Sequence, residues 1–162
     1  MRTSHYGIGF AVAGMLMLGV GCASEMSGSG TTMKQESGMK QAAQPSLYER
    51  LGKKEAITAV VDDFVGRVAN DGRINGKFAN ANIPHLKAML VEQICAASGG
   101  PCTYTGRDMK TTHAGMAITN EQFDALVGDL VAALNKFNVP EREKKELLGA
   151  LGPMRKDIVT AM

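Results

Sequence analysis

An amphipathic run that begins at Thr119 is the feature of this sequence that most constrains its fold. Thr119 and Gln122 have the spacing of a capping box, in which each side chain accepts a hydrogen bond from the other residue's backbone at a helix start. Apolar side chains then recur every three or four residues, which is the period of one helix face. They are Phe123, Leu126, Val127, Leu130, Val131, Leu134 and Phe137. A helix over residues 119–138 is therefore predicted, with one face that other elements must cover.

Other segments also have helical signals, and no part of the chain alternates with the period of a strand. Ser46 and Glu49 form a second capping box. The expected helices cover residues 46–52, 55–71, 83–98, 119–138 and the region after Pro140, where Gly152 and Pro153 should kink or interrupt the helix. Apolar residues make up 44% of the chain, with 11 Met and no Trp, which suits a helical core. The sequence therefore predicts an all-α domain.

The charge of the chain excludes one class of partner. It carries 18 basic and 16 acidic residues, for a net charge of +2, and they are mixed along the sequence. Because no basic stripe stands out, we expect no nucleic acid as a partner.

Residues 1–21 have the features of an export signal, which takes no part in the mature fold. Arg2 gives a positive start and an apolar run over residues 7–21 follows. This run is shorter than the roughly 20 apolar residues of a membrane-spanning helix. Residues 23–45 are rich in small and polar residues without any period, so we expect a flexible tether there. The folded domain is then residues 46–162.

The residues that end in Cys22, Leu18-Gly-Val-Gly-Cys22, resemble a bacterial lipobox, although Gly19 stands where a large aliphatic residue is usual. The resemblance implies lipidation of Cys22, with plain secretion or a retained membrane anchor as alternatives. Ala23 after the cysteine resembles an outer-membrane sorting signal of Gram-negative bacteria. We therefore expect an exported protein, lipid-anchored in the cell envelope and facing the periplasm.

Cys95 and Cys102 are the two cysteines of the predicted folded domain. Gly99 and Gly100 lie between them and allow the chain to turn back. An exported, oxidising location favours a disulfide over two free thiols. A structural zinc site is not expected, because the two cysteines lack companions at ligand spacing.

His113 lies in a short polar segment between two glycines, just ahead of the helix that begins at Thr119. An imidazole at the edge of a packed core is a suitable ligand for a buried metal. The same position is also common for an ordinary structural histidine. The residues around His113 leave both interpretations open.

Ten short motifs are spread across residues 46–162. They are Ser46-Leu-Tyr-Glu-Arg-Leu-Gly52, Val61-Asp-Asp-Phe64, Arg67-Val68, Gly99-Gly-Pro101, Tyr104-Thr-Gly106, Met109-Lys110, His113-Ala-Gly115, Ile118-Thr119, Phe123-Asp-Ala125 and Val139-Pro140. In this order and spacing they resemble the group I truncated haemoglobins. The resemblance implies a truncated globin, a two-on-two helical sandwich around one haem b, with the diatomic gases O2, NO and CO as ligands.

The resemblance also implies which residues hold the haem. His113 would be the proximal ligand, binding iron through Nε2 while its other nitrogen donates to a carbonyl. Phe78 matches the phenylalanine that packs on the haem face in globins, and Met109 is expected in the apolar wall. Arg107 and Lys110 flank the proximal segment, where they would pair with the haem propionates or remain solvated surface charges.

The distal side departs from the family. Val65 stands where most relatives have Tyr, Leu90 stands where they bring a Gln to the ligand, and Leu86 is the neighbouring distal position one turn earlier. The predicted pocket is apolar, with no evident hydrogen-bond donor. A hydrogen-bond donor stabilises iron-bound O2 by roughly 1–3 kcal/mol. We therefore expect O2 binding to be about tenfold to a hundredfold weaker than in relatives, with NO and CO less affected.

The leading functional prediction is a haem protein of the oxygen-binding or carrier type. A nitric oxide dioxygenase is the enzymatic alternative, and the apolar pocket weakens it because that reaction needs a stable oxygen complex. Met89 offers a third prediction, since some relatives have a histidine there that takes the sixth iron site. A Met89 ligand would make an electron-transfer haem that works with a reductase or redox partner. The fourth is a structural lipoprotein that has lost haem.

Overall fold

The computed structural model describes residues 44–161, and within them the backbone forms helices and loops without strands. The α-helices are α1 (Leu47–Arg50), α2 (Lys53–Asn70), α3 (Ile83–Ala97), α4 (Met109–His113), α5 (Asn120–Lys136), α6 (Glu141–Leu151) and α7 (Arg155–Ile158). Two 3-10 segments are η1 (Asn75–Phe78) and η2 (Gly152–Met154). No helix of this part of the chain is long and apolar enough to cross a membrane. The predicted export signal, Cys22 and most of the predicted tether lie outside the described residues.

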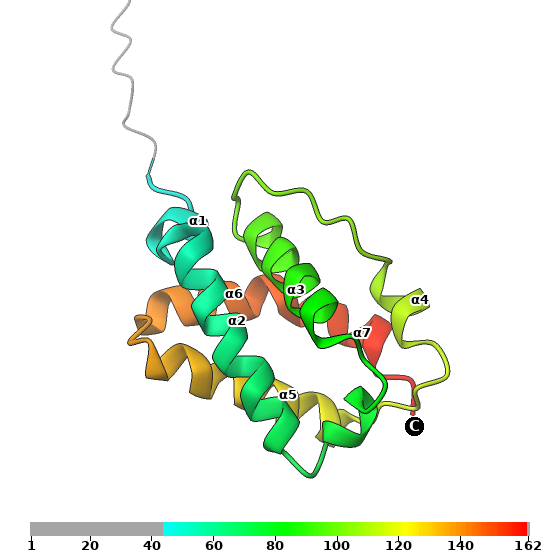
Figure 1. The fold of residues 1–162 in the computed structure, drawn as a ribbon. Helices are drawn as coiled ribbons and strands as arrows, with labels where there is room; N and C mark the ends of the chain where they lie inside the picture. The colour runs from blue at the N-terminus through cyan, green and yellow to red at the C-terminus, as the bar shows by residue number, and fades with distance from the viewer. Residues whose placement is uncertain (1–43, 162) are drawn as a thin grey trace, which may run out of the picture. The chain divides into compact units, whose positions relative to one another are not determined.

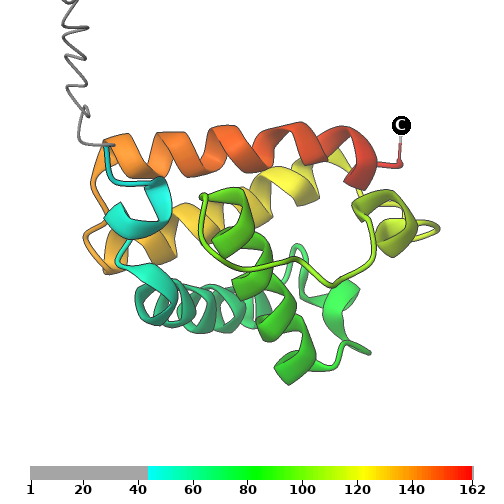
Figure 2. The same cartoon turned by 90° about the horizontal axis from the view of Figure 1, so that it is seen from above.

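Helix α2 lies at the centre of the fold, packed against both α3 and α5 (Figure 1). Figure 2 shows two layers, with α2 and α3 in one and α5 and α6 in the other. The main core is built from both layers. Its buried members are Leu47, Ile57, Val60, Val61, Phe64, Val65, Val68, Ile74, Val91, Ile94, Cys95, Ala125, Leu130, Ala133, Leu134 and Leu147. The predicted all-α, two-on-two sandwich is confirmed.

Both predicted capping boxes are present. The Ser46 hydroxyl accepts from the backbone N–H of Glu49 at 3.2 Å, and the Glu49 carboxylate accepts from the backbone N–H of Ser46 at 2.9 Å. The Thr119 hydroxyl and the Gln122 side-chain carbonyl accept from each other's backbone N–H groups, both at 3.2 Å. These bonds satisfy N–H groups that a helix start leaves without intrahelical partners. They fix where α1 and α5 begin.

The remaining helices agree with the prediction at one point and differ from it at two. Gly152 and Pro153 interrupt the last helix as predicted, since η2 separates α6 from α7. Helix α4 is absent from the sequence-based prediction, because five residues are too few to show an apolar period. Phe137 was expected on the buried face of α5, but it is 41% exposed. It is the C-cap residue of α5, so its backbone has already left the helix.

A second apolar cluster lies apart from the main core and joins α4, the start of α5 and α7. Its buried residues are Ile118, Phe123 and Ile158, with Met109, Met116, Val127, Met154 and Val159 packed against them. Helix α4 contacts α7 directly, and the Arg155 guanidinium lies 4.9 Å from the centre of the Phe123 ring. The described domain therefore has two separate apolar clusters, with α4 supported by the smaller one.

Candidate functional site

His113 is the last residue of α4 and is half-buried. Its Nδ1 lies 2.7 Å from the backbone carbonyl oxygen of Met109, one helical turn earlier. A carbonyl oxygen only accepts hydrogen bonds, so Nδ1 must carry the proton and donate. In the neutral imidazole Nε2 then keeps a free lone pair. This is the form in which a histidine binds a metal, with its other nitrogen fixed by a hydrogen bond.

The segment before α4 is held in place by its own hydrogen bonds. Asp108 caps the helix by accepting from the backbone N–H of Thr111 at 2.8 Å. Hydrogen bonding from the Thr111 side chain, and then from its backbone, lowers the pKa of Asp108. The Tyr104 hydroxyl donates to the carbonyl oxygen of Arg107 at 3.0 Å, and burial raises the pKa of Tyr104, so the hydroxyl keeps its proton. Gly106 leaves room for this ring, because a Cβ there would lie 2.3 Å from the Tyr104 hydroxyl oxygen. These contacts orient the helix that ends in His113.

The four predicted apolar pocket residues come from α2, η1 and α3. Val65 is buried in the main core, and Phe78 and Leu90 are half-buried and packed against it. Leu86, one turn before Leu90, is also half-buried. Val65, Phe78 and Leu90 belong to the larger apolar cluster, whereas Met109 belongs to the smaller one.

The residues present fit a haem. A haem needs an imidazole with a free nitrogen for its iron and apolar side chains for its two faces. His113 offers the free nitrogen, and Met109 lies beside it in the smaller cluster. Phe78 and Leu90 offer half-buried apolar surface from the larger cluster. Both clusters thus have apolar side chains that are only half covered, and a flat apolar group such as a haem could cover the rest.

Three other predicted residues have positions that leave their roles open. Arg107 and Lys110 are exposed, just before α4 and in its first turn. Their access to solvent suits carboxylates at the rim of a pocket, and it equally suits solvated surface charges. Met89 is half-buried on α3, next to Leu90 in sequence. The propionate and sixth-ligand roles of these residues stay predictions.

Gln93 is a polar residue of this region that is absent from the sequence-based prediction. It follows Leu86 and Leu90 at helical spacing, so the three lie on one face of α3. Its Nε2 lies 3.0 Å from the sulfur of Met154 and 3.6 Å from the sulfur of Met109. A thioether is a weak acceptor, so this amide is poorly satisfied. The face of α3 that carries the two leucines thus also carries one hydrogen-bond donor, the Gln93 amide. The helical spacing of Gln93 from Leu86 is the sequence signal that could have identified it.

Lys77 is a second residue absent from that prediction. Its Nζ donates to the carbonyl oxygens of Met116 at 2.6 Å and Ala117 at 3.3 Å. The contact joins η1 to the loop that follows His113. Its partners are about forty positions away in sequence, so nothing local to Lys77 indicates it.

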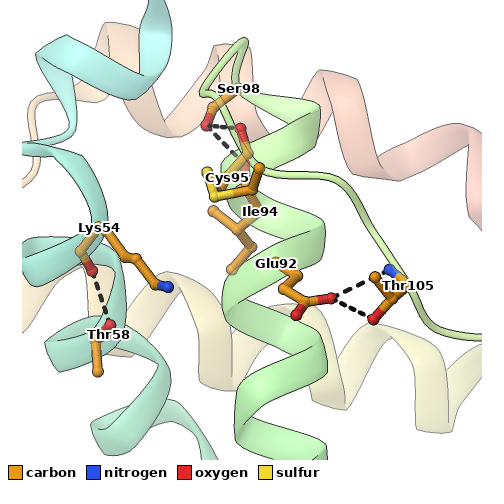
Figure 3. Close-up of a disulfide and its surroundings, with 8 residues drawn as sticks. Lys54, Thr58, Glu92, Ile94, Cys95, Ser98 and Thr105 are labelled. Carbon is orange, nitrogen blue, oxygen red and sulfur yellow. Dashed lines mark hydrogen bonds between the residues drawn. A yellow bond between two sulfur atoms is a disulfide. The ribbon is translucent and has the colours of Figure 1, made fainter.

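The connection between α3 and α4 is fastened to α3 at two points (Figure 3). Cys95 and Cys102 form a disulfide with a Cα–Cα distance of 5.7 Å, so the structure pairs the same cysteines as the sequence-based prediction. One turn earlier, the Glu92 carboxylate accepts from the backbone N–H of Thr105 at 3.1 Å and from its hydroxyl at 2.9 Å. These bonds lower the pKa of Glu92, so the acceptor is ionised at neutral pH. The segment that leads to α4 is therefore tied to the helix that carries Leu86 and Leu90.

Comparison with known proteins gives a consistent result. The family model for bacterial-like globins matches residues 46–160. The group 1 truncated hemoglobin GlbN of Mycolicibacterium paratuberculosis is 40% identical over 121 residues, which cover 75% of this chain and 89% of the relative. The crystal structure of truncated hemoglobin from Tetrahymena pyriformis in its Fe(III) form has a TM-score of 0.69 at 30% identity, over 71% of this chain and 98% of that one. The 2/2 hemoglobin from Synechococcus, solved with covalently attached heme, has a TM-score of 0.67 at 30% identity, over 71% of this chain and 98% of that one. The chain belongs to the bacterial-like globins and, within them, to the group 1 truncated haemoglobins.

Proposed function

We propose that this globin binds one haem b through His113 and uses it to bind diatomic gases reversibly. The family to which the chain belongs binds such gases through haem. The observation that carries the assignment to His113 is the hydrogen bond from its Nδ1 to the carbonyl oxygen of Met109, which leaves Nε2 free. When bound, the haem supplies an iron that accepts a gas molecule as a ligand. The chain supplies the proximal nitrogen and fixes its orientation.

The other residues of the site have simpler roles in this proposal. Phe78 and Met109 would contact the faces of the macrocycle, since both present partly uncovered apolar surface in their own clusters. Arg107 and Lys110 would pair with the propionates from the solvent side. These contacts would exclude water from the iron and keep the ring from rotating.

On the gas side we propose a pocket that is poor in hydrogen-bond donors, formed by Val65, Leu86 and Leu90. Without a donor, O2 gains no charge-assisted hydrogen bond, which would otherwise be worth roughly 1–3 kcal/mol. O2 affinity should therefore be low relative to CO and NO. This favours gas binding over the nitric oxide dioxygenase alternative, which needs long retention of O2. The next hydrogen-bond donor on this face of α3 is the side-chain amide of Gln93, one turn beyond Leu90.

The test is the absorption spectrum of the full-length protein expressed with haem available. The wild type should show a Soret band in the ferric, ferrous and CO-bound forms, and His113→Ala should lose haem or its proximal-ligand spectrum. His85→Ala is the matched control, because His85 is an exposed histidine on α3. A His113→Ala variant with a wild-type spectrum would rule out the assignment. A six-coordinate low-spin ferric spectrum that becomes five-coordinate in Met89→Leu would instead support the electron-transfer alternative with a His113/Met89 haem and a redox partner.

We also propose that the chain is exported and anchored to the cell envelope by lipid at Cys22, facing the periplasm. The support is the lipobox-like sequence before Cys22 and the apolar run that precedes it. Two acyl signals on one residue would make the attachment stable. The test is metabolic labelling with a radioactive fatty acid. Label in the wild type and none in Cys22→Ala is expected, whereas equal labelling of both would exclude the proposal.

A further inference from the structure

Lys77 makes an unusual contact for a lysine. Most lysines extend into water, but this one is half-buried, and its ammonium group donates to two backbone carbonyls at 2.6 and 3.3 Å. The two acceptors belong to adjacent residues, Met116 and Ala117. Such charge-assisted hydrogen bonds are stronger than neutral ones and hold a long side chain in one position.

The loop that receives Lys77 has a particular shape. It follows His113 directly, and the Met116 N–H donates back to the His113 carbonyl oxygen at 3.2 Å. Gly115 and Ala117 both have left-handed backbone angles, with φ of 76° and 47°. A positive φ is uncommon for alanine. This turn leaves the carbonyls of residues 116 and 117 within reach of one ammonium group.

The two ends of the contact lie next to the two residues most directly tied to the haem. Lys77 directly precedes Phe78 in η1, and its acceptors follow His113 by three and four residues. Phe78 packs against the main core, whereas Met116 belongs to the smaller apolar cluster. The contact is therefore a polar bridge between the two clusters, from one wall of the site to the other.

We propose that Lys77 is a clasp that closes one edge of the haem site and determines how long the haem stays bound. The inference rests on the proposed function, since it assumes haem between Phe78 and His113. Haem leaves a globin through an opening between the walls of its site, and opening at this edge must first break both hydrogen bonds of Lys77. Lys77 is thus a positioning residue, which acts through the loop after His113 and not on the iron.

The test is the rate of haem transfer from the full-length ferric holoprotein to an excess of apomyoglobin, followed in the Soret band. Lys77→Met keeps the length of the side chain and removes the donor. We expect its haem loss to be about tenfold faster, which corresponds to about 1.4 kcal/mol. Lys77→Arg keeps a charged donor and should restore a rate close to that of the wild type, which a role in packing alone would not predict.

The matched control is Lys87→Met. Lys87 lies on α3 and its Nζ pairs with Asp62 of α2 at 2.8 Å, so it joins two helices of the same layer without reaching the loop after His113. Its haem loss should stay at the wild-type rate. An unchanged rate in Lys77→Met, or an equal acceleration in Lys87→Met, overturns the clasp while the Soret band of the wild type still supports the proposed function. A wild type without a Soret band overturns both.

Discussion

Removing the disulfide tests how far the connection from α3 to α4 depends on a covalent link. The perturbation is the double variant Cys95→Ala/Cys102→Ala. Alanine is preferred to serine because Cys95 is fully buried, with 0% exposure, and would leave a serine hydroxyl without water. The sequence separation of the two cysteines is 7, and chain entropy for so short a loop gives about 2.5 kcal/mol. For a domain of this size, losing this stabilisation corresponds to a fall in Tm of about 10 °C.

The assay is thermal unfolding of the full-length protein followed by far-UV circular dichroism, with every sample in the same haem-loaded state so that ligand linkage is equal. Wild type unfolded in the presence of a strong reductant is the matched control, because it lacks the cross-link but keeps both sulfur atoms. It should melt close to the double variant, and any remaining difference measures the packing of the lost sulfurs. A double variant that melts within about 2 °C of the oxidised wild type would refute the loop-entropy reasoning.

Three further predictions concern a carboxylate, the gas pocket and an ion pair. Burial, and then repulsion from Asp71, raises the pKa of Asp129, and its Oδ2 is buried without a hydrogen-bond partner. The folded protein should therefore lose stability as the pH rises from 3.8, the ordinary pKa of an aspartate, through the raised pKa of Asp129. Asp129→Asn should stabilise the protein by about 1 kcal/mol at pH 7 and lose this gain below pH 3.8, as measured by thermal melts at different pH. Leu90→Gln should slow O2 dissociation about tenfold to a hundredfold in stopped-flow measurements while CO dissociation changes little, and an equal effect of Leu90→Met would contradict the hydrogen-bond explanation. Arg50→Met should cost about 2 kcal/mol in urea unfolding, because the carboxylate of the buried Glu143, 3.0 Å from Arg50 Nε, is left unpaired; a loss below about 0.5 kcal/mol would show that water compensates it.

The parts of the fold that were predicted correctly depend on residues close together in sequence. The capping box of Thr119 and Gln122 fixes the start of α5 within one turn, and Gly152 and Pro153 interrupt the last helix wherever it packs. The pairing of Cys95 with Cys102 needs only a short turn between them. Each signal acts over fewer than about ten residues, so no knowledge of the tertiary structure is required.

The parts that were not predicted depend on contacts between distant segments. Helix α4 has five residues, too few for a hydrophobic period, and it is supported by contact with α7. Lys77 has no local feature that separates it from a surface lysine, because its partners lie across the site. Gln93 is an intermediate case. Its position on the face of Leu86 and Leu90 follows from spacing, but its contacts with Met109 and Met154 do not.

The place of α2 in the chain has a consequence for the order in which the domain can fold. Its buried face, Ile57 to Val68, is covered by α3 and α5, and both of these helices follow it in sequence. During synthesis from the N-terminus this face stays only partly covered until Lys136, the last residue of α5, has left the ribosome. A partly made chain therefore lacks a complete core for most of the time it is being synthesised. The apolar residues of α2 are therefore open to non-native contacts until late in synthesis.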